Sequence, residues 1–244
     1  MPLSRPARLL TVSGLALLLV TGGCSGGSAD APPERDISAR LESARSRLDD
    51  AASLKIRLVS DDLPDGTVGL VEADGFGNHD PAFEGVVTIV GAGLGQVDAD
   101  VVSVKGDVEA KVGFVPRFTP VDPADLGAPD PAALLSADNG VSSWLTQSDQ
   151  LTVGEDSRDG ETILTSIRGE LPGAVVQQLI PTADETAAFD VVYRLDDDDA
   201  LRDAAITGPF YPGGADVTYD LTVSASDQSV SIELPSRSDT DTGA

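Results

Sequence analysis

The sequence predicts a mainly β (α+β) protein, in which about ten or eleven strands form one large, strongly bent antiparallel sheet with short helices across its apolar face. Three observations predict this class. Apolar and polar residues alternate over most of the chain after Leu54, as expected for antiparallel strands with one covered face. Turn residues separate these runs at short intervals. Strands do not alternate with helices along the chain, as they would in a parallel sheet.

The N-terminus has the pattern of a secretory signal. Two basic residues, Arg5 and Arg8, precede an apolar run over residues 9–20, and small residues follow. A basic start, a short apolar run and a small-residue cleavage site define such a signal. The run is shorter than the roughly 20 residues that a membrane-spanning helix needs. We therefore expect residues 1–23 to be removed on export.

Cys24 is the only cysteine of the chain, and it directly follows two glycines. This arrangement resembles a bacterial lipobox, in which the cysteine thiol receives a diacylglycerol, although Thr21 stands where leucine or valine is usual. Residues 24–36 are rich in Gly, Ser and Pro and indicate a flexible tether. Two acyl chains hold a protein stably at a membrane, so we expect anchoring at the outer face of the plasma membrane. A plain secretory signal with a free cysteine is the alternative.

The chain is strongly acidic, with 41 acidic and 16 basic residues and a formal net charge of −25. Such a surface repels phosphate groups, which excludes nucleic acid as a partner. Aromatic residues are few: six Phe, three Tyr and one Trp. The interior must therefore be built mainly from Val, Ala, Leu and Ile.

The first half predicts one helix and then strands. Apolar residues recur at helical spacing over 37–52, and Asp36 is the expected N-cap. Period-two strands are predicted over 83–89, 97–101 and 108–114, with a hairpin turn at Gly106-Asp107.

The middle of the chain, residues 120–147, is rich in proline and then helical. Asp130 is the expected cap, Pro131 the first helical residue, and Asn139-Gly140 the end of that turn. Val141, Trp144 and Leu145 then form a short apolar stripe. We expect Trp144 in a core or interface, with a stacking platform for a sugar as the alternative.

The second half returns to strands. Asp159-Gly160 is predicted to join two of them, and residues 171–181 form a short helix that Pro181 ends. Further strands follow over 189–195, 217–225 and 230–234. The tail, residues 236–244, is polar and expected to be disordered.

The sequence holds no constellation of residues for catalysis or metal binding. His79 is the only histidine and lies in the turn-like stretch GFGNHDPAF, where a solvated turn residue is expected. No G-x-S-x-G motif accompanies it, and one histidine without a free cysteine makes a poor zinc site. GAGLG, residues 91–95, leads into a strand and lacks the P-loop lysine, so it indicates a strand connection. The acidic run 196–199 lacks the spacing of a calcium loop and indicates a charged turn.

In this order, the elements resemble the actinobacterial LppX/LprA/LprF/LprG lipoprotein family, most closely its LprG branch. The resemblance covers nearly all of residues 24–235. It rests on the lipobox, on a helix running into LKIRLVS, and on the segments GVVTIVGAGLGQVDADVVSVKGDVEAKV, PADLGAPDPAALLSADNGVSSWL and EDSRDGETILTSIRGELPGAVVQQLIP. In the hairpin VSVKGDVEAKVGF this chain departs from the family, whose members more often carry an aromatic residue after the turn.

The resemblance implies a half-barrel over residues 37–235 whose concave side, covered by helices, encloses a hydrophobic cavity. It implies binding of multi-acylated lipids or glycolipids and their movement from the plasma membrane towards the outer envelope. An efflux-type membrane transporter is the implied partner of the LprG branch. No catalytic group and no cofactor are needed for this function.

Strand phase selects candidate residues for the cavity wall. The resemblance places the strand with Val87 and Ile89 along the pocket, so these two residues are the first candidates. The others are Val101, Val112, Phe114, Ile163, Ile167, Phe189, Val191, Leu221 and Val223. Each of them alternatively belongs to an ordinary packed core. The rival hypothesis is accordingly an envelope lipoprotein with a filled core that acts as a scaffold or interaction module, and an enzyme is a more distant alternative.

Overall fold

The computed structural model describes residues 34–61, 63–91, 95–113, 117–213 and 215–235. In this part of the chain, eleven strands form one antiparallel sheet in the order β6-β5-β4-β3-β2-β1-β11-β10-β9-β8-β7. The two edge strands do not pair with each other, so the sheet stays open. The predicted mainly β class with a single antiparallel sheet is confirmed. The strands are β1 (Ser53–Val59), β2 (Gly69–Asn78), β3 (Ala82–Gly91), β4 (Gly95–Val104), β5 (Asp107–Val112), β6 (Thr119–Pro120), β7 (Asp149–Asp159), β8 (Thr162–Pro172), β9 (Ala188–Leu195), β10 (Leu201–Gly208) and β11 (Val217–Ser226).

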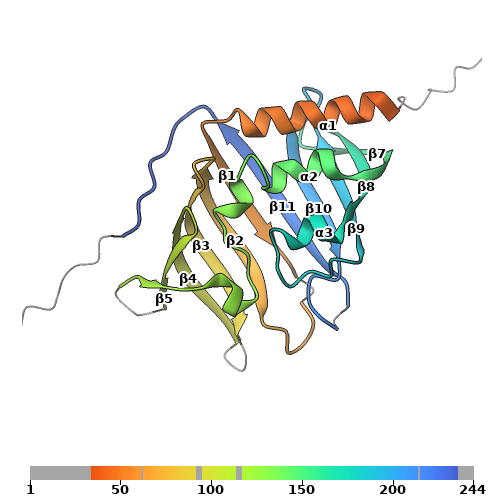
Figure 1. The fold of residues 1–244 in the computed structure, drawn as a ribbon. Helices are drawn as coiled ribbons and strands as arrows, with labels where there is room; N and C mark the ends of the chain where they lie inside the picture. Colours follow the sequence, from red (N-terminus) through yellow and green to blue (C-terminus); the bar gives the residue numbers. More distant parts are fainter. Residues whose placement is uncertain (1–33, 62, 92–94, 114–116, 214, 236–244) are drawn as a thin grey trace, which may run out of the picture. The chain divides into compact units, whose positions relative to one another are not determined.

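The order of the strands forces one connection across the sheet. β6 and β7 follow each other in the chain, yet they form opposite edges. The chain between them must therefore run from edge to edge over one face. It carries the 3₁₀-helices η1 (Pro123–Leu126) and η2 (Ala133–Leu135) and helix α2 (Val141–Gln147). Figure 1 shows this crossing segment in green in front of the sheet.

Helix α1 (Glu34–Asp49) packs one face on the core through Ile37, Leu41, Ala44 and Leu48. It begins at Glu34, so Asp36 lies inside the helix and is not its N-cap, and it ends at Asp49, before the predicted boundary at residue 52.

Both predicted hairpin turns exist, each centred one residue away from the prediction. Lys105 and Gly106 have φ values of 55° and 93°, as a two-residue type I′ turn requires, and Asp107 already pairs with Val104. The second turn lies between Asp159 and Thr162, which pair with each other. A turn signal in the sequence identifies the loop but leaves its register open by one residue.

Two other predicted elements differ from the structure. Helix α3 spans only Gly173–Gln177 and ends well before Pro181. Residues 230–234 are not a strand, because they form no ladder with the sheet. Instead Ile232 packs with Ala82 and Val102 on the outer side of the β3–β4 hairpin. Alternation there reflects an extended segment that lies on a surface.

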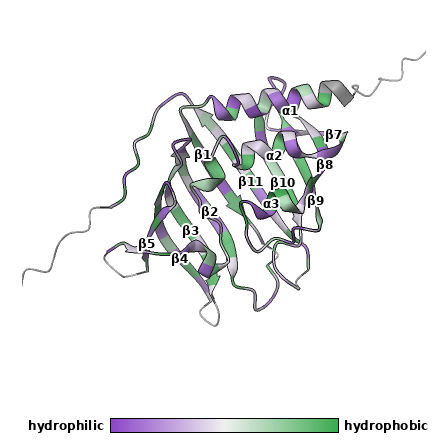
Figure 2. Ribbon diagram, in the orientation of Figure 1, coloured by the Kyte–Doolittle hydropathy of each residue, from purple (hydrophilic) through white to green (hydrophobic). Residues whose placement is uncertain are grey.

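One half of the sheet carries a filled core. Hydrophobic and hydrophilic residues alternate along the strands (Figure 2), and the inward side chains of β1 and β8–β11 pack under the three α-helices. Phe210 makes edge-to-face contacts with Phe189 and Tyr219, each with ring centroids 4.9 Å apart. Trp144 is buried beside them, as expected for a core residue. The void that Trp144, Phe210 and Tyr219 line measures only about 10 Å³.

Candidate functional site

The other half of the sheet is hollow. A cavity of about 560 Å³ lies between strands β2–β5, which we call the floor, and residues 121–134 of the crossing segment, which we call the roof. Within the described chain its lining is aliphatic except for Asp125. The floor residues are Leu70, Ala73, Val87, Ile89, Gly91, Val97, Ala99, Val101, Val108, Ala110 and Val112, with Val68 just before β2.

The structure brings four of the predicted wall residues together at this cavity. Val87 and Ile89 on β3, Val101 on β4 and Val112 on β5 all line it. They share one side of the sheet because residues two apart on a strand point the same way. Phe114 lies outside the described residues.

The remaining predicted wall residues lie elsewhere. Ile163 is 36% exposed near the start of β8. The others are at most 3% exposed and belong to the packed core: Ile167, Phe189, Val191, Leu221 and Val223. The correction has a simple physical reason. Strand phase identifies the covered face of a sheet, but the packing of the covering helices decides which half of that face is filled.

Sequence reasoning missed the roof and strand β2. The roof residues that line the cavity are Val121, Pro123, Asp125, Leu126, Ala128, Pro129, Pro131 and Leu134. Proline has no backbone N–H, so a proline-rich segment that follows an edge strand runs over a sheet without joining it. The density of prolines between residues 120 and 131 was the available signal. The glycines of β2 hid the strand pattern.

Gly75 of β2 and Gly85 of β3 make room for a large side chain. A Cβ on Gly75 would lie 2.5 Å from the Cζ atom of Phe83, and one on Gly85 would lie 2.7 Å from the same atom. Phe83 therefore packs directly against the backbone of β2 and β3, with no exposed surface. A larger residue at either glycine would displace its ring.

Asp130 ties the roof to the floor. Ser103 on β4 donates a hydrogen bond to Asp130 Oδ1 over 2.6 Å. The same oxygen accepts the N–H of Ala132 over 3.0 Å. Because η2 begins only at Ala133, Asp130 holds the turn before this helix and is not its N-cap, and Pro131 is not its first residue. The carboxylate thus fixes the start of η2 above β4.

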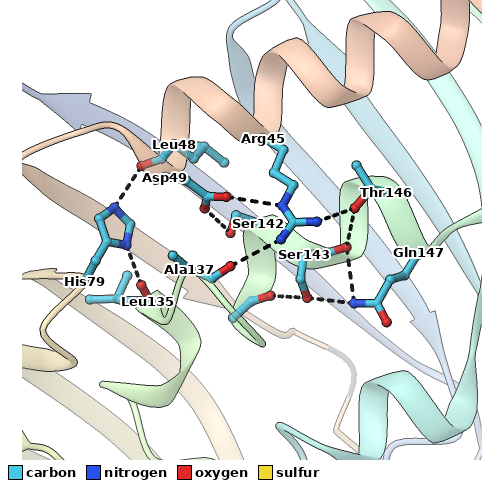
Figure 3. Close-up of polar contacts among 11 residues, drawn as sticks. Arg45, Leu48, Asp49, His79, Leu135, Ala137, Ser142, Ser143, Thr146 and Gln147 are labelled. Carbon is cyan, nitrogen blue, oxygen red and sulfur yellow. Dashed lines mark hydrogen bonds and ion pairs between the residues drawn. The ribbon is translucent and has the colours of Figure 1, made fainter.

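His79 ties the crossing segment, at Leu135 just after the roof, to helix α1 (Figure 3). Its Nε2 lies 2.9 Å from the carbonyl oxygen of Leu48, and its Nδ1 lies 2.7 Å from the carbonyl oxygen of Leu135. The expectation of a solvated turn histidine was wrong: the residue does lie in a turn, but the ring bridges two segments. The contacting groups are backbone carbonyls, which no side-chain motif in the sequence reveals.

Arg45 holds the end of the crossing segment (Figure 3). Its guanidinium donates to Thr146 Oγ1 over 2.7 Å and to Asp49 Oδ2 over 3.2 Å. Ser142 in turn donates to Asp49 Oδ1 over 2.6 Å. Helix α2 is therefore attached to α1 by side-chain hydrogen bonds as well as by apolar packing.

A pair of tyrosines marks the border between the hollow and the filled half. The N–H of Leu70 donates to the Tyr211 hydroxyl over 3.2 Å, and the Tyr219 hydroxyl donates to the Leu70 carbonyl over 2.7 Å. The two hydroxyl oxygens are 2.6 Å apart, so Tyr211 donates to Tyr219 and closes a ring of hydrogen bonds. Burial raises the pKa of Tyr211 above its ordinary value. The β1–β2 ladder ends at the pair Val59–Glu72, so the tyrosines satisfy backbone groups beyond it.

The described residues contain no group of ligands that would hold a metal ion. Arginines and backbone amides engage the acidic turn 196–199: Arg202 contacts the Asp196 carboxylate over 3.0 Å, and Arg40 contacts Asp199 over 2.5 Å. The Asp196 carboxylate also accepts two backbone N–H groups. The turn is therefore charged, as predicted, and serves to anchor α1. Among the described helices none is long and apolar enough to cross a bilayer.

The comparisons with known proteins agree with this geometry. The family model described as LppX_LprAFG lipoprotein matches residues 36–232. The structure of LprF from Mycobacterium bovis is similar, with a TM-score of 0.65 and 15% identity over 83% of this chain and 98% of that one. The lipoprotein LppX from Mycobacterium tuberculosis has a TM-score of 0.58 and 14% identity over 82% of this chain and 100% of that one. No curated protein sequence matches significantly.

The family match extends over most of the chain, from α1 to the segment behind β11. At the low identities found, the two solved structures show the same fold. The chain belongs to the LppX/LprA/LprF/LprG family, whose members are exported, envelope-associated, lipid-binding lipoproteins and not enzymes.

Proposed function

We propose that this lipoprotein binds the acyl chains of lipids or glycolipids in the cavity under residues 121–134 and carries them from the plasma membrane towards the outer envelope. One observation carries the proposal: an aliphatic cavity of about 560 Å³ in a chain whose other half-sheet is tightly packed. The rival hypothesis of a filled core expects no such space. A cavity of this size destabilises a protein unless something occupies it.

Hydrophobic transfer explains why a carrier is needed. Each methylene exposed to water costs about 0.8 kcal/mol, so a long acyl chain does not cross an aqueous layer unaided. Floor residues such as Val87, Val101 and Ala110 offer only carbon atoms to a ligand. The carrier therefore needs no reacting group: it exchanges one apolar environment for another.

The anchor and the partner complete the proposal. Cys24 is the proposed attachment point for a diacylglycerol, and residues 1–23 are the proposed signal that is removed. Residues 24–36 are the proposed tether, although the last three of them already belong to α1. The folded part would then face away from the outer leaflet of the plasma membrane, because its excess of acidic residues is repelled by anionic headgroups. An efflux-type membrane transporter that delivers or receives the lipid is the proposed partner.

Native mass spectrometry of the full chain tests the proposal. The chain is prepared with Cys24→Ser, so that retained lipid is not confused with an attached acyl group. We expect co-purified acyl lipid in this protein and clearly less of it in Val87→Trp, whose indole occupies part of the cavity. Val86→Trp is the matched control, because Val86 is the next residue on β3 and is 44% exposed on the other face. Equal lipid retention by the two tryptophan variants would contradict the proposal.

A further inference from the structure

We infer that the cavity encloses about twenty acyl carbons, which is one long chain or two short ones, and that Leu134 with the Tyr211–Tyr219 pair sets this limit. The inference rests on the proposed function and narrows its substrate class. A lipid with two or three long chains would leave the additional chains outside the protein.

The volume gives the number of carbons. An apolar cavity of about 150 Å³ accommodates one benzene, which has six carbons. The cavity of about 560 Å³ is almost four times as large. At the same packing density it holds about 22 carbons. Two hexadecanoyl chains contain clearly more carbons than that.

The cavity cannot lengthen towards the filled half of the sheet, because that border is closely packed. Leu134 lines the cavity on one side and the small void of the packed core on the other. Behind it, Tyr211 and Tyr219 are held by the closed ring of hydrogen bonds to Leu70. Phe210 packs edge to face on Tyr219 and is 1% exposed. A longer chain would have to displace aromatic rings that have no free space beside them.

The roof is equally constrained at this end. The carbonyl oxygen of Leu135, the neighbour of Leu134, contacts the His79 ring. The Asp130 carboxylate accepts the hydrogen bond from Ser103 on the floor. Both contacts lie within five residues of Leu134. The roof therefore cannot lift here without losing them.

A chain-length series tests the limit. Delipidated full chain carrying Cys24→Ser is incubated with monoacyl phosphatidylglycerols that have one headgroup and 10 to 26 acyl carbons, and relative affinity is read by native mass spectrometry. We expect affinity to rise about fourfold per methylene until the cavity is full, and to stop rising near about twenty carbons. With two chains, the dioctanoyl lipid should be enclosed whole, whereas the dihexadecanoyl lipid should bind no more tightly than a monoacyl lipid at the plateau, compared at equal free concentration after allowing for its lower solubility.

Two neighbouring variants make the test specific. Leu134→Ala removes a border side chain, so the plateau should move to longer chains by several carbons. Leu135→Ala removes a side chain of the same size that is 2% exposed and does not line the cavity, so its plateau should stay in place. A series that keeps rising to 26 carbons, or an equal shift in both variants, overturns the capacity limit and leaves lipid binding intact. No binding of any acyl lipid overturns the proposed function itself.

Discussion

The hydroxyl oxygens of Tyr211 and Tyr219 lie 2.6 Å apart. Together they make the hydrogen bonds to the backbone of Leu70 that a neighbouring strand would otherwise make. Each hydroxyl also contacts one backbone group of that residue. Gly69 makes this approach possible, because a Cβ there would lie 2.4 Å from the Tyr211 oxygen. The pair thus fixes the point at which the sheet passes from its filled to its hollow half.

Removing the first of these hydroxyls should destabilise the protein. Tyr211→Phe leaves the Leu70 N–H without its acceptor in a buried place, which costs about 1–3 kcal/mol. Urea unfolding measures the loss. Thr207→Val is the control, because the contact between Thr207 and Thr218 is only partly buried and its loss should stay within about 0.5 kcal/mol. Equal stabilities of the two variants would show that the ring of hydrogen bonds is unimportant.

The filled half should resist enlargement at Gly208. A Cβ there would lie 2.3 Å from the Cδ1 atom of Phe189, so Gly208→Ala forces the ring to move and should cost about 1–3 kcal/mol. Gly154→Ala is a milder comparison, since its new Cβ would approach only to 3.3 Å of Ser166. Thermal unfolding of both variants checks the order. A Gly154 variant less stable than the Gly208 variant would contradict it.

Bound lipid should raise the melting temperature. A ligand that binds only the folded state adds about 2.7 kcal/mol at a concentration of 100 Kd. For a domain of this size that corresponds to a rise of about 5–10 °C. Differential scanning fluorimetry with a monoacyl lipid measures it. Val87→Trp should show a smaller rise at the same lipid concentration, and a rise of the same size in that variant would place the ligand elsewhere.

Alkaline pH should unfold the protein through its buried tyrosines. Tyr193 is 2% exposed and donates its hydroxyl to Ser148 over 2.8 Å. Burial raises the pKa of Tyr193, against the smaller opposing effect of the Ser148 hydrogen bond. Above about pH 10 the unfolded chain releases this proton while the folded chain keeps it, so stability falls by about 1.4 kcal/mol per pH unit per tyrosine.

Tyr193→Phe should reduce that loss. Its free energy of unfolding is measured in urea between pH 9 and 11.5. Above about pH 10 it should decline by about 1.4 kcal/mol less per pH unit than that of the unchanged protein. Below pH 9 the two curves should run parallel, because neither state titrates a tyrosine there. Parallel curves above pH 10 would show that Tyr193 ionises in the folded protein.

Loss of the His79 bridge should loosen the roof. His79→Ala leaves the carbonyl groups of Leu48 and Leu135 without their ring contacts, which should cost about 1–3 kcal/mol. Amide hydrogen exchange should accelerate in residues 133–136. Asp80→Ala in the same turn removes only an exposed ion pair with Lys105 and should leave exchange unchanged. Unchanged exchange in the His79 variant would show that apolar packing alone holds this segment in place.

Periodicity predicted the sheet well and its cavity only in part. Val87 and Val101 were identified because alternation is local and survives any arrangement of the remaining chain. Phe189 and Val223 show the same alternation, yet they lie in the packed core. The difference between them depends on where α1, α2 and α3 lie, which is a property of the whole fold.

Three further features were beyond a reading of local pattern. The bridge at His79 uses the backbone carbonyls of Leu48 and Leu135, which every residue possesses. Strand β2 interrupts its apolar pattern with glycines that allow close contacts, such as that of Gly75 with Phe83. The segment at Ile232 alternates like a strand but forms no ladder, since it packs on side chains.

The strand that completes the sheet at its centre is the last one in the described chain. Ser53 of β1 pairs with Ser226 of β11, so nearly the whole folded sequence lies between these neighbours. Closing so long a loop is entropically costly and makes folding slow. A polypeptide that stopped before β11 would also lack a central strand of the sheet. Two separate half-sheets would remain, each with an additional unpaired edge that can aggregate. Such a truncated chain would therefore be a substrate for quality-control proteases. Loss of the two-residue strand β6 would remove only an edge strand.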